Sequence, residues 1–296
     1  MMRSMPVARR VAFAVVLAVL GSAVLAQAES ASDEFPYQES IDYDADGDVD
    51  QGDLARAAQN PVASMISLPL QNNFFFGVGP EEGTLWVLNV QPVIPVSAGK
   101  WNLINRPIFP LINTPAIAPG IGGESGLGDL NYQLFVSPAK PSKFIWGAGP
   151  ALVFPTATED ILGSEKWSAG PAVVGLAMPG QFVVGFVAQQ VWSYAGDDDR
   201  ADVSEFLTQL FVNYNFSKGW YVTSAPIITA NWEADSDQRW VVPIGGGVGK
   251  ILKIGKQPVN MNLQIYYNLE APDALGDWQG RFQFQFLFPK KPKSPA

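Results

Sequence analysis

Apolar and polar residues alternate with a period of two over most of the chain after residue 60, and this alternation predicts β-strands. The last alternating segment is the clearest, because Phe282, Phe284 and Phe286 share one face while Gln283 and Gln285 share the other. No segment after residue 60 shows a competing helical period. The chain is therefore expected to be all-β beyond this point.

About twelve such segments follow one another, joined alternately by short turns and longer loops. An even number of antiparallel strands is typical of single-chain bacterial outer-membrane barrels. It places both ends of the barrel on one side of the membrane, which would be the periplasmic side. The predicted strands span residues 62–77, 84–97, 100–113, 126–138, 143–155, 166–178, 181–195, 203–217, 219–233, 237–251, 257–271 and 276–289.

The composition of the strand faces distinguishes a membrane barrel from a water-soluble sandwich, because both folds alternate. One face is wide and aromatic, whereas the other carries Asn, Gln and single charges. This favours an antiparallel transmembrane β-barrel with lipid outside and water or packed polar side chains inside. Many predicted strands end near a tryptophan, a residue that prefers the headgroup level of a membrane. These are Trp86, Trp101, Trp167, Trp192, Trp220, Trp232, Trp240 and Trp278.

Six prolines fall inside the predicted strands, where each removes one donor from the hydrogen-bond ladder. A closed barrel has no edge strand that could hold them, so we expect bulges or kinks at these positions. If the prolines end the strands instead, the count of twelve is wrong. The prolines are Pro92, Pro107, Pro150, Pro171, Pro226 and Pro243.

The charges follow the same order of turns and loops. Lys residues concentrate in the short turns and the tail, and Asp and Glu in or beside the longer loops, which predicts one basic rim and one acidic rim. The formal net charge of −9 argues against nucleic acid, whose binding depends on Lys and Arg that neutralise phosphates. The chain contains no Cys and no His, which excludes Cys- or His-based nucleophilic catalysis and the usual zinc ligand sets.

The amino-terminal segment has the pattern of a cleaved export signal. Arginines precede an apolar run over residues 11–25, and Ala26 and Ala28 flank Gln27 as at a signal-peptidase site. The alternative is a membrane anchor, although the run is shorter than the ~20 residues that a spanning helix needs. The expected organisation is a signal peptide over 1–28, a periplasmic segment over 29–61, an outer-membrane barrel over 62–289 and a basic tail over 290–296.

An acidic segment over residues 42–53 has the spacing of a twelve-residue calcium loop. Gly47 occupies the sharp sixth position, Val49 is the apolar eighth residue, and Asp50 is expected to act through water. The twelfth position is Asp rather than Glu and no helical pattern precedes the loop, so it resembles dockerin-type loops more than a helix–loop–helix. The alternative is a solvated acidic linker. The predicted Ca²⁺ ligands are Asp42, Asp44, Asp46 and Asp53, with Asp48 contributing its backbone carbonyl.

Four motifs in the first predicted strands carry a resemblance to a known family. They are SLPLQNNF at 67–74, GVGP at 77–80, LNVQPVIP at 88–95 and WNLINRPIFP at 101–110. The chain resembles a family of exported bacterial barrels catalogued under the meta-pathway of phenol degradation, some of which are mislabelled neuromedin U. The resemblance implies an outer-membrane barrel associated with uptake of aromatic or other hydrophobic compounds. It carries over no catalytic residues.

Single charges on or near the polar strand faces are candidates for lining the barrel interior. They would form either a structural network in the lumen or a constriction that selects the solute. The sequence does not determine whether Arg106 pairs with Glu205. The candidates are Arg106, Glu205, Arg239, Glu270 and Arg281.

These features lead to three functional hypotheses. The first is an outer-membrane channel for passive uptake of small, hydrophobic or aromatic solutes, embedded in lipid and lipopolysaccharide, whose acidic mouth disfavours anions. The second is a structural or docking barrel that anchors a calcium-dependent interaction with a periplasmic protein. The third is an outer-membrane hydrolase, which without His lacks the usual base for a Ser nucleophile. We therefore expect a protein that is not an enzyme.

Overall fold

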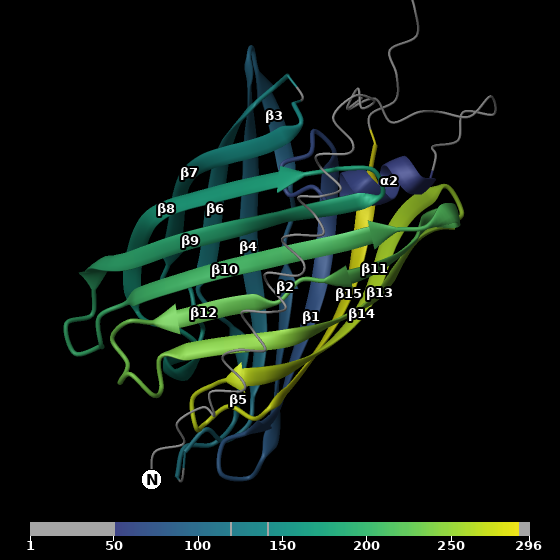
Figure 1. Ribbon diagram of the computed structural model, residues 1–296. Helices are drawn as coiled ribbons and strands as arrows, with labels where there is room; N and C mark the ends of the chain where they lie inside the picture. The colour runs from purple at the N-terminus through teal and green to yellow at the C-terminus, as the bar shows by residue number, and fades with distance from the viewer. Residues whose placement is uncertain (1–50, 119, 141, 290–296) are drawn as a thin grey trace, which may run out of the picture.

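The computed structural model describes residues 51–118, 120–140 and 142–289 (Figure 1). The predicted signal peptide, most of the predicted calcium loop and the basic tail lie outside the described residues. The described part consists of strands, apart from one α-helix, α2 (Gln51–Ala58), and two 3-10 turns, η1 (Asp160–Leu162) and η2 (Ser217–Gly219).

Fifteen strands form one sheet. The first eight are β1 (Ile66–Val78), β2 (Gly83–Val90), β3 (Ile94–Ala98), β4 (Trp101–Thr114), β5 (Glu124–Leu127), β6 (Leu130–Pro138), β7 (Phe144–Phe154) and β8 (Lys166–Ala177). The remaining seven are β9 (Phe182–Gly196), β10 (Ser204–Asn215), β11 (Trp220–Ser224), β12 (Ile227–Asn231), β13 (Trp240–Ile254), β14 (Gln257–Glu270) and β15 (Trp278–Phe288).

The sheet closes into a barrel because β9 pairs with β10 and β1 pairs with both β15 and β2. Three barrel strands are each made of two segments, namely β2 with β3, β5 with β6, and β11 with β12, because both segments pair with the same neighbouring strand. The fifteen strands therefore make twelve antiparallel barrel strands, and the predicted fold and strand number are confirmed.

The predicted assignment of faces also holds. In β15, Gln279, Arg281 and Gln285 are buried in the interior, whereas Trp278 and Phe288 at its ends are exposed on the outside. The neighbouring β14 repeats this arrangement, because its amides at alternate positions are buried while Leu263 and Ile265 are the most exposed residues of the strand. The period of two thus separates an apolar exterior from an interior that is polar on this side.

The prolines perturb the strands without opening the barrel. Pro92 separates β2 from β3, Pro226 separates β11 from β12, and the register of β13 against β14 shifts between Val242 and Pro243. The expected kinks and bulges are confirmed at these three prolines. The other three, Pro107, Pro150 and Pro171, lie within continuous strands, and Pro150 faces Pro171 across β7 and β8.

The interior has two chemically different halves. On β4 and β6 to β10 the inner face is largely an apolar cluster that includes Ile104, Phe135, Val174, Val183 and Phe211. On β1, β14 and β15 the inner face carries buried amides. The chain therefore packs one half of its barrel like a core and leaves the other half polar.

Helix α2 covers part of one end of this barrel, near the ends of β13 and β15 in Figure 1. Its Leu54 and Ala55 are fully buried and pack with Ile251 of β13 and Leu287 of β15. The helix is short, so this packing stabilises it more than its intrinsic propensity does. The sequence predicts a short helix here over 54–59, and in the structure the helix begins three residues earlier and ends one residue earlier.

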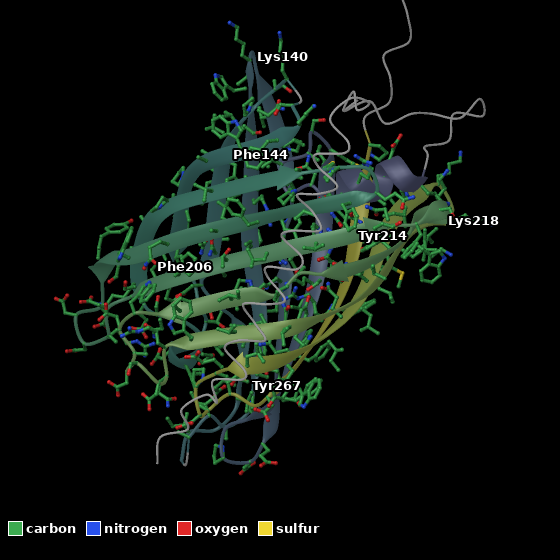
Figure 2. The ribbon with its side chains drawn as sticks, in the orientation of Figure 1. Lys140, Phe144, Phe206, Tyr214, Lys218 and Tyr267 are labelled. Carbon is green, nitrogen blue, oxygen red and sulfur yellow. The ribbon has the colours of Figure 1, made fainter. Side chains whose placement is uncertain are left out.

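The short turns and the long loops lie at opposite ends of the barrel. Lys140 and Lys218 mark the end that also holds α2, whereas Phe206 and Tyr267 lie toward the end with the acidic loops (Figure 2). The predicted basic and acidic rims are therefore present. Within the described residues, helices do not reach the length and apolar character needed to cross a membrane.

Candidate functional site

A cavity of about 130 Å³ lies inside the barrel and is partly open to solvent. Residues 58–61, at and just after the end of α2, form its floor, and the inner faces of several strands form its walls. Most of the lining side chains carry amides or hydroxyls. The lining residues are Ala58, Gln59, Asn60, Pro61, Ser67, Pro69, Gln71, Gln91, Val93, Arg106, Gln209, Phe211, Asn213, Tyr221, Thr223, Ala225, Asn260, Asn262, Gln264, Arg281, Gln283 and Gln285.

A buried hydrogen-bond network forms the polar wall of the cavity. The hydroxyl of Tyr221 donates to Oδ1 of Asn260 at 2.7 Å, and Nδ2 of Asn260 donates to Oε1 of Gln285 at 3.0 Å. The Tyr221 hydroxyl also accepts from Nδ2 of Asn262 at 3.4 Å. Its ring passes so close to β13 that a Cβ at Gly249 would lie 2.1 Å from Cζ. Glycine at this position is therefore what allows the network to form.

Arg281 organises the wall at the break between β11 and β12. Its Nε donates to Oδ1 of Asn73 at 3.1 Å, and its Nη1 donates to the carbonyl oxygen of Ala225 at 2.7 Å. The Ala225 N–H in turn donates to the hydroxyl of Tyr266 at 3.0 Å, and the guanidinium lies 5.1 Å from the centre of the Tyr266 ring. Side chains of the interior thus satisfy the backbone groups that the break before Pro226 leaves without strand partners.

Arg106 lines the same cavity from β4. Its Nη1 donates to Oε1 of Gln133 at 3.0 Å, and Nε2 of Gln133 donates to Oε1 of Gln189 at 2.7 Å. Nε of Arg106 is buried and has no hydrogen-bond partner among the described residues. The side chain therefore retains an unused donor within the barrel.

The floor of the cavity is fastened to the rim by polar contacts. Arg56 of α2 donates from Nη2 to the carbonyl oxygen of Met178 at 3.0 Å and from Nη1 to that of Gly180. Gln59 and Asn215 exchange two amide hydrogen bonds, of 2.9 and 3.1 Å. Since α2 packs on β13 and β15 but reaches the turn between β8 and β9, it spans the opening at the basic end.

The other three predicted interior charges lie toward the acidic rim. Glu205 is exposed on β10, directly across from the inward-facing Val191. Arg239 precedes β13, where it donates to the Ala234 carbonyl at 3.3 Å, and Glu270 is the last residue of β14. Only Arg106 and Arg281 of the five predicted charges line the cavity, so the structure does not bring the set together as one constriction.

Arg106 and Glu205 do not form an ion pair. The two ion pairs within the described residues join Lys166 to Asp202 at 3.5 Å and Arg200 to Glu165 at 3.8 Å, both beside long loops. Neither of these pairs involves a charge that lines the cavity.

The predicted calcium loop is represented in the structure by its last residues alone. Asp53 lies in the first turn of α2, whereas Asp42, Asp44, Asp46 and Asp48 lie outside the described residues. Within the described ranges, Asp and Glu do not form a group of three that could hold a metal ion. The Ca²⁺ site therefore stays a prediction.

The sequence pattern alone does not identify the amides and tyrosines as parts of a cavity. The alternation in β14 places Asn260, Asn262, Gln264 and Tyr266 on the polar face, and this face is the inner one. The alternation does not show that Tyr221, on a strand not adjacent to β14, donates to this face. It also gives no sign that the end of α2 forms the floor.

Comparison with known proteins supports the fold. No protein-family model matches the chain, and no curated protein matches it, so the family resemblance stays a resemblance. An outer-membrane channel from Pseudomonas putida F1 is 16% identical, covers 76% of this chain and 94% of its own, and superposes with a TM-score of 0.57. The monoaromatic hydrocarbon channel CymD and a calcium-bound outer-membrane phospholipase dimer from Salmonella typhi are 10% and 12% identical. They cover 79% and 81% of this chain and 92% and 98% of their own, with TM-scores of 0.44 and 0.42. These last two scores are too low to establish a common fold.

Proposed function

We propose that this protein is a bacterial outer-membrane channel for the passive uptake of small, hydrophobic or aromatic solutes. The observation that carries the proposal is a closed barrel whose outer wall is apolar and whose interior holds a polar cavity. In water this arrangement would expose the apolar outer wall to solvent. In a lipid bilayer the apolar wall contacts acyl chains and the polar interior can hold water.

The outer wall has the composition expected of a surface in contact with lipid. Leu263, Ile265 and Val248 are 61, 57 and 51% exposed on neighbouring strands. A soluble monomer rarely exposes so continuous an apolar surface. This exposed apolar surface supports placement of the barrel in the outer membrane, where it would contact lipid and lipopolysaccharide.

Exposed aromatic residues form a girdle at each end of the barrel. At the basic end Trp101 lies edge-on to Trp146 at 6.3 Å, and at the acidic end Trp232 lies edge-on to Trp240 at 5.4 Å. Lys250 lies 4.6 Å above the ring of the exposed Trp220, also at the basic end. Tryptophan and lysine in this arrangement are typical of the two membrane–water interfaces, because ring and stem are apolar while N–H and ammonium groups reach water.

The channel function is supported by the architecture and by the likeness to the outer-membrane channel from Pseudomonas putida. A barrel of twelve strands is wider than one of eight, whose side chains fill it, and narrower than an open porin of sixteen. The cavity of about 130 Å³ is close in size to one that holds a single benzene ring and is too small for a polymer. The aromatic or hydrophobic nature of the solute follows from the sequence resemblance. Passage through such a lumen requires no catalytic group.

The proposal is tested by reconstituting the purified full-length mature protein into liposomes. Swelling rates would be measured with phenol, toluene, arabinose and a disaccharide, and current would be measured in planar bilayers. We expect single-ring solutes to pass faster than the disaccharide. Protein-free liposomes are the control. Heat-modifiable gel migration confirms that the barrel is folded in each preparation, and a folded barrel that passes none of these solutes would exclude the channel function.

A further inference from the structure

The lining of the cavity differs in charge from the rest of the protein. The chain has a formal net charge of −9, yet among the described residues that line the cavity the charged side chains are Arg106 and Arg281, and none is Asp or Glu. The carboxylates are concentrated in the long loops instead. The cavity is therefore a positively charged compartment inside an acidic protein.

Neither arginine has a carboxylate partner within 4.0 Å in the described part of the chain. Arg281 is 5% exposed, and its partners are the Asn73 side chain and the Ala225 carbonyl, both of which are neutral. Arg106 donates to the neutral Gln133, and its Nε is buried without a partner. A buried guanidinium that lacks a counter-charge is costly. An ionisable group inside a membrane-embedded barrel is therefore a candidate for a functional site.

The remaining donors of the two arginines suit a carboxylate. A guanidinium presents five N–H donors in a fixed planar fork, and this fork matches the two oxygens of a carboxylate. Hydrogen bonds to neutral groups occupy two donors of Arg281 and one of Arg106. The neighbouring amides of Asn262 and Gln264 offer further neutral polar contacts at the same wall.

The same cavity has an apolar side that could receive a ring. Val93, Phe211 and Ala225 line it and also belong to the buried apolar cluster of the barrel interior. Ala225 is the residue whose carbonyl oxygen Arg281 contacts, so the charged group and this apolar side are adjacent. A ligand that carries a ring and a carboxylate would satisfy both features of the cavity at once.

We propose that the cavity is a binding site for small aromatic carboxylates, held by Arg281 and Arg106. This inference rests on the proposed function and names the substrate class of that channel more narrowly. The acidic rim slows the approach of anions, as expected from the sequence, while the interior stabilises an anion once it has entered. Selection among solutes therefore occurs at the arginines rather than at the mouth.

The experiment measures binding separately from passage. Benzoate, its neutral analogue benzamide, and inorganic phosphate are titrated by calorimetry into the folded full-length protein in detergent at low salt. We expect benzoate to bind and the other two to bind at least about tenfold more weakly. The double variant R106Q/R281Q should lose the preference for benzoate over benzamide, whereas R200Q, which removes a loop arginine paired with Glu165, should retain it.

The variants R106K and R281K keep the charge but remove the planar fork, so they should bind benzoate with intermediate affinity. If heat-modifiable migration shows that the double variant does not fold, benzoate binding by these two lysine variants still tests the role of the arginines. Wild-type protein that does not bind benzoate, phosphate binding as tight as benzoate binding, or unchanged preference in folded R106Q/R281Q would each overturn the proposal. Benzoate binding by a barrel that passes no solute would leave this site standing and remove the channel function instead.

Discussion

Ala225 has no functional side chain, yet its backbone connects several residues of the cavity. Because the strand breaks before Pro226, the N–H and C=O of Ala225 have no partners in the strand ladder. The N–H donates to the Tyr266 hydroxyl instead, and the C=O accepts from Arg281. Buried backbone groups are rarely left unpaired, because an unmade hydrogen bond is expensive in a site shielded from water. A proline in the wall thus determines where an arginine is held in the interior.

At the residue scale, Tyr221→Phe should lower the free energy of unfolding by about 1 kcal/mol or somewhat more, because it leaves Asn260 with one hydrogen bond fewer in a buried network. The measurement is equilibrium unfolding in urea from lipid vesicles, followed by tryptophan fluorescence. The matched control is Tyr194→Phe, which removes a hydroxyl from a side chain that is 67% exposed and should change stability little. Equal effects of the two variants would show that the network adds no stability.

At the element scale, α2 covers part of the basic end of the lumen, where its apolar face packs on β13 and β15 and Arg56 fastens it to the turn between β8 and β9. Arg56→Ala removes the hydrogen bonds to the carbonyls of Met178 and Gly180. We predict a larger or more frequently open current in planar bilayers, because the segment that forms the cavity floor is then held less firmly. Lys100→Ala removes an exposed charge from a short turn at the same rim without touching these contacts and should leave the current near the wild-type value. Identical currents in Arg56→Ala and wild type would show that α2 does not limit passage.

The predicted calcium loop runs directly into α2, since its twelfth position is Asp53. We predict that the full-length protein binds Ca²⁺ with a dissociation constant of roughly tens of micromolar to millimolar, as expected for a single loop without a partner. The double variant Asp44→Ala/Asp46→Ala should abolish this binding in calorimetry. The pair Asp198→Ala/Asp199→Ala, in an acidic loop at the other rim, is the control. Binding that survives loss of Asp44 and Asp46 would place the ion elsewhere.

At the scale of the whole molecule, the environment of the outer wall determines how much a charged residue placed on that wall lowers the stability of the barrel. Leu263 is 61% exposed in the middle of β14, so Leu263→Arg should destabilise the folded barrel in vesicles by about 2–4 kcal/mol if this face meets the bilayer interior. In a water-soluble protein the same exposed substitution would cost little. Leu263→Ala controls for lost packing. An unfolding free energy unchanged by arginine would contradict a membrane position.

The barrel itself could be predicted from the sequence, because strand faces follow from a period of two and rims follow from the charges in turns. The alternation of Phe284 and Phe286 with Gln283 and Gln285 is enough to assign the last strand and its inner side. Contacts across the interior could not be predicted in this way. Gln133 meets Gln189 from a strand that is not its neighbour, and such meetings depend on barrel curvature and side-chain length rather than on local pattern.

The docking of α2 on Ile251 and Leu287 has a consequence for the order of biogenesis. These two partners belong to β13 and β15, which lie almost 200 residues or more after the helix in the chain, so the helix has no complete seat until these strands have paired through β14. Pairing of β14 with both β13 and β15 therefore comes before, or together with, the seating of α2 over the basic end of the barrel. In an assembly intermediate that lacks the last strand, Leu54 would be exposed to water and α2 would not cover the basic end of the barrel.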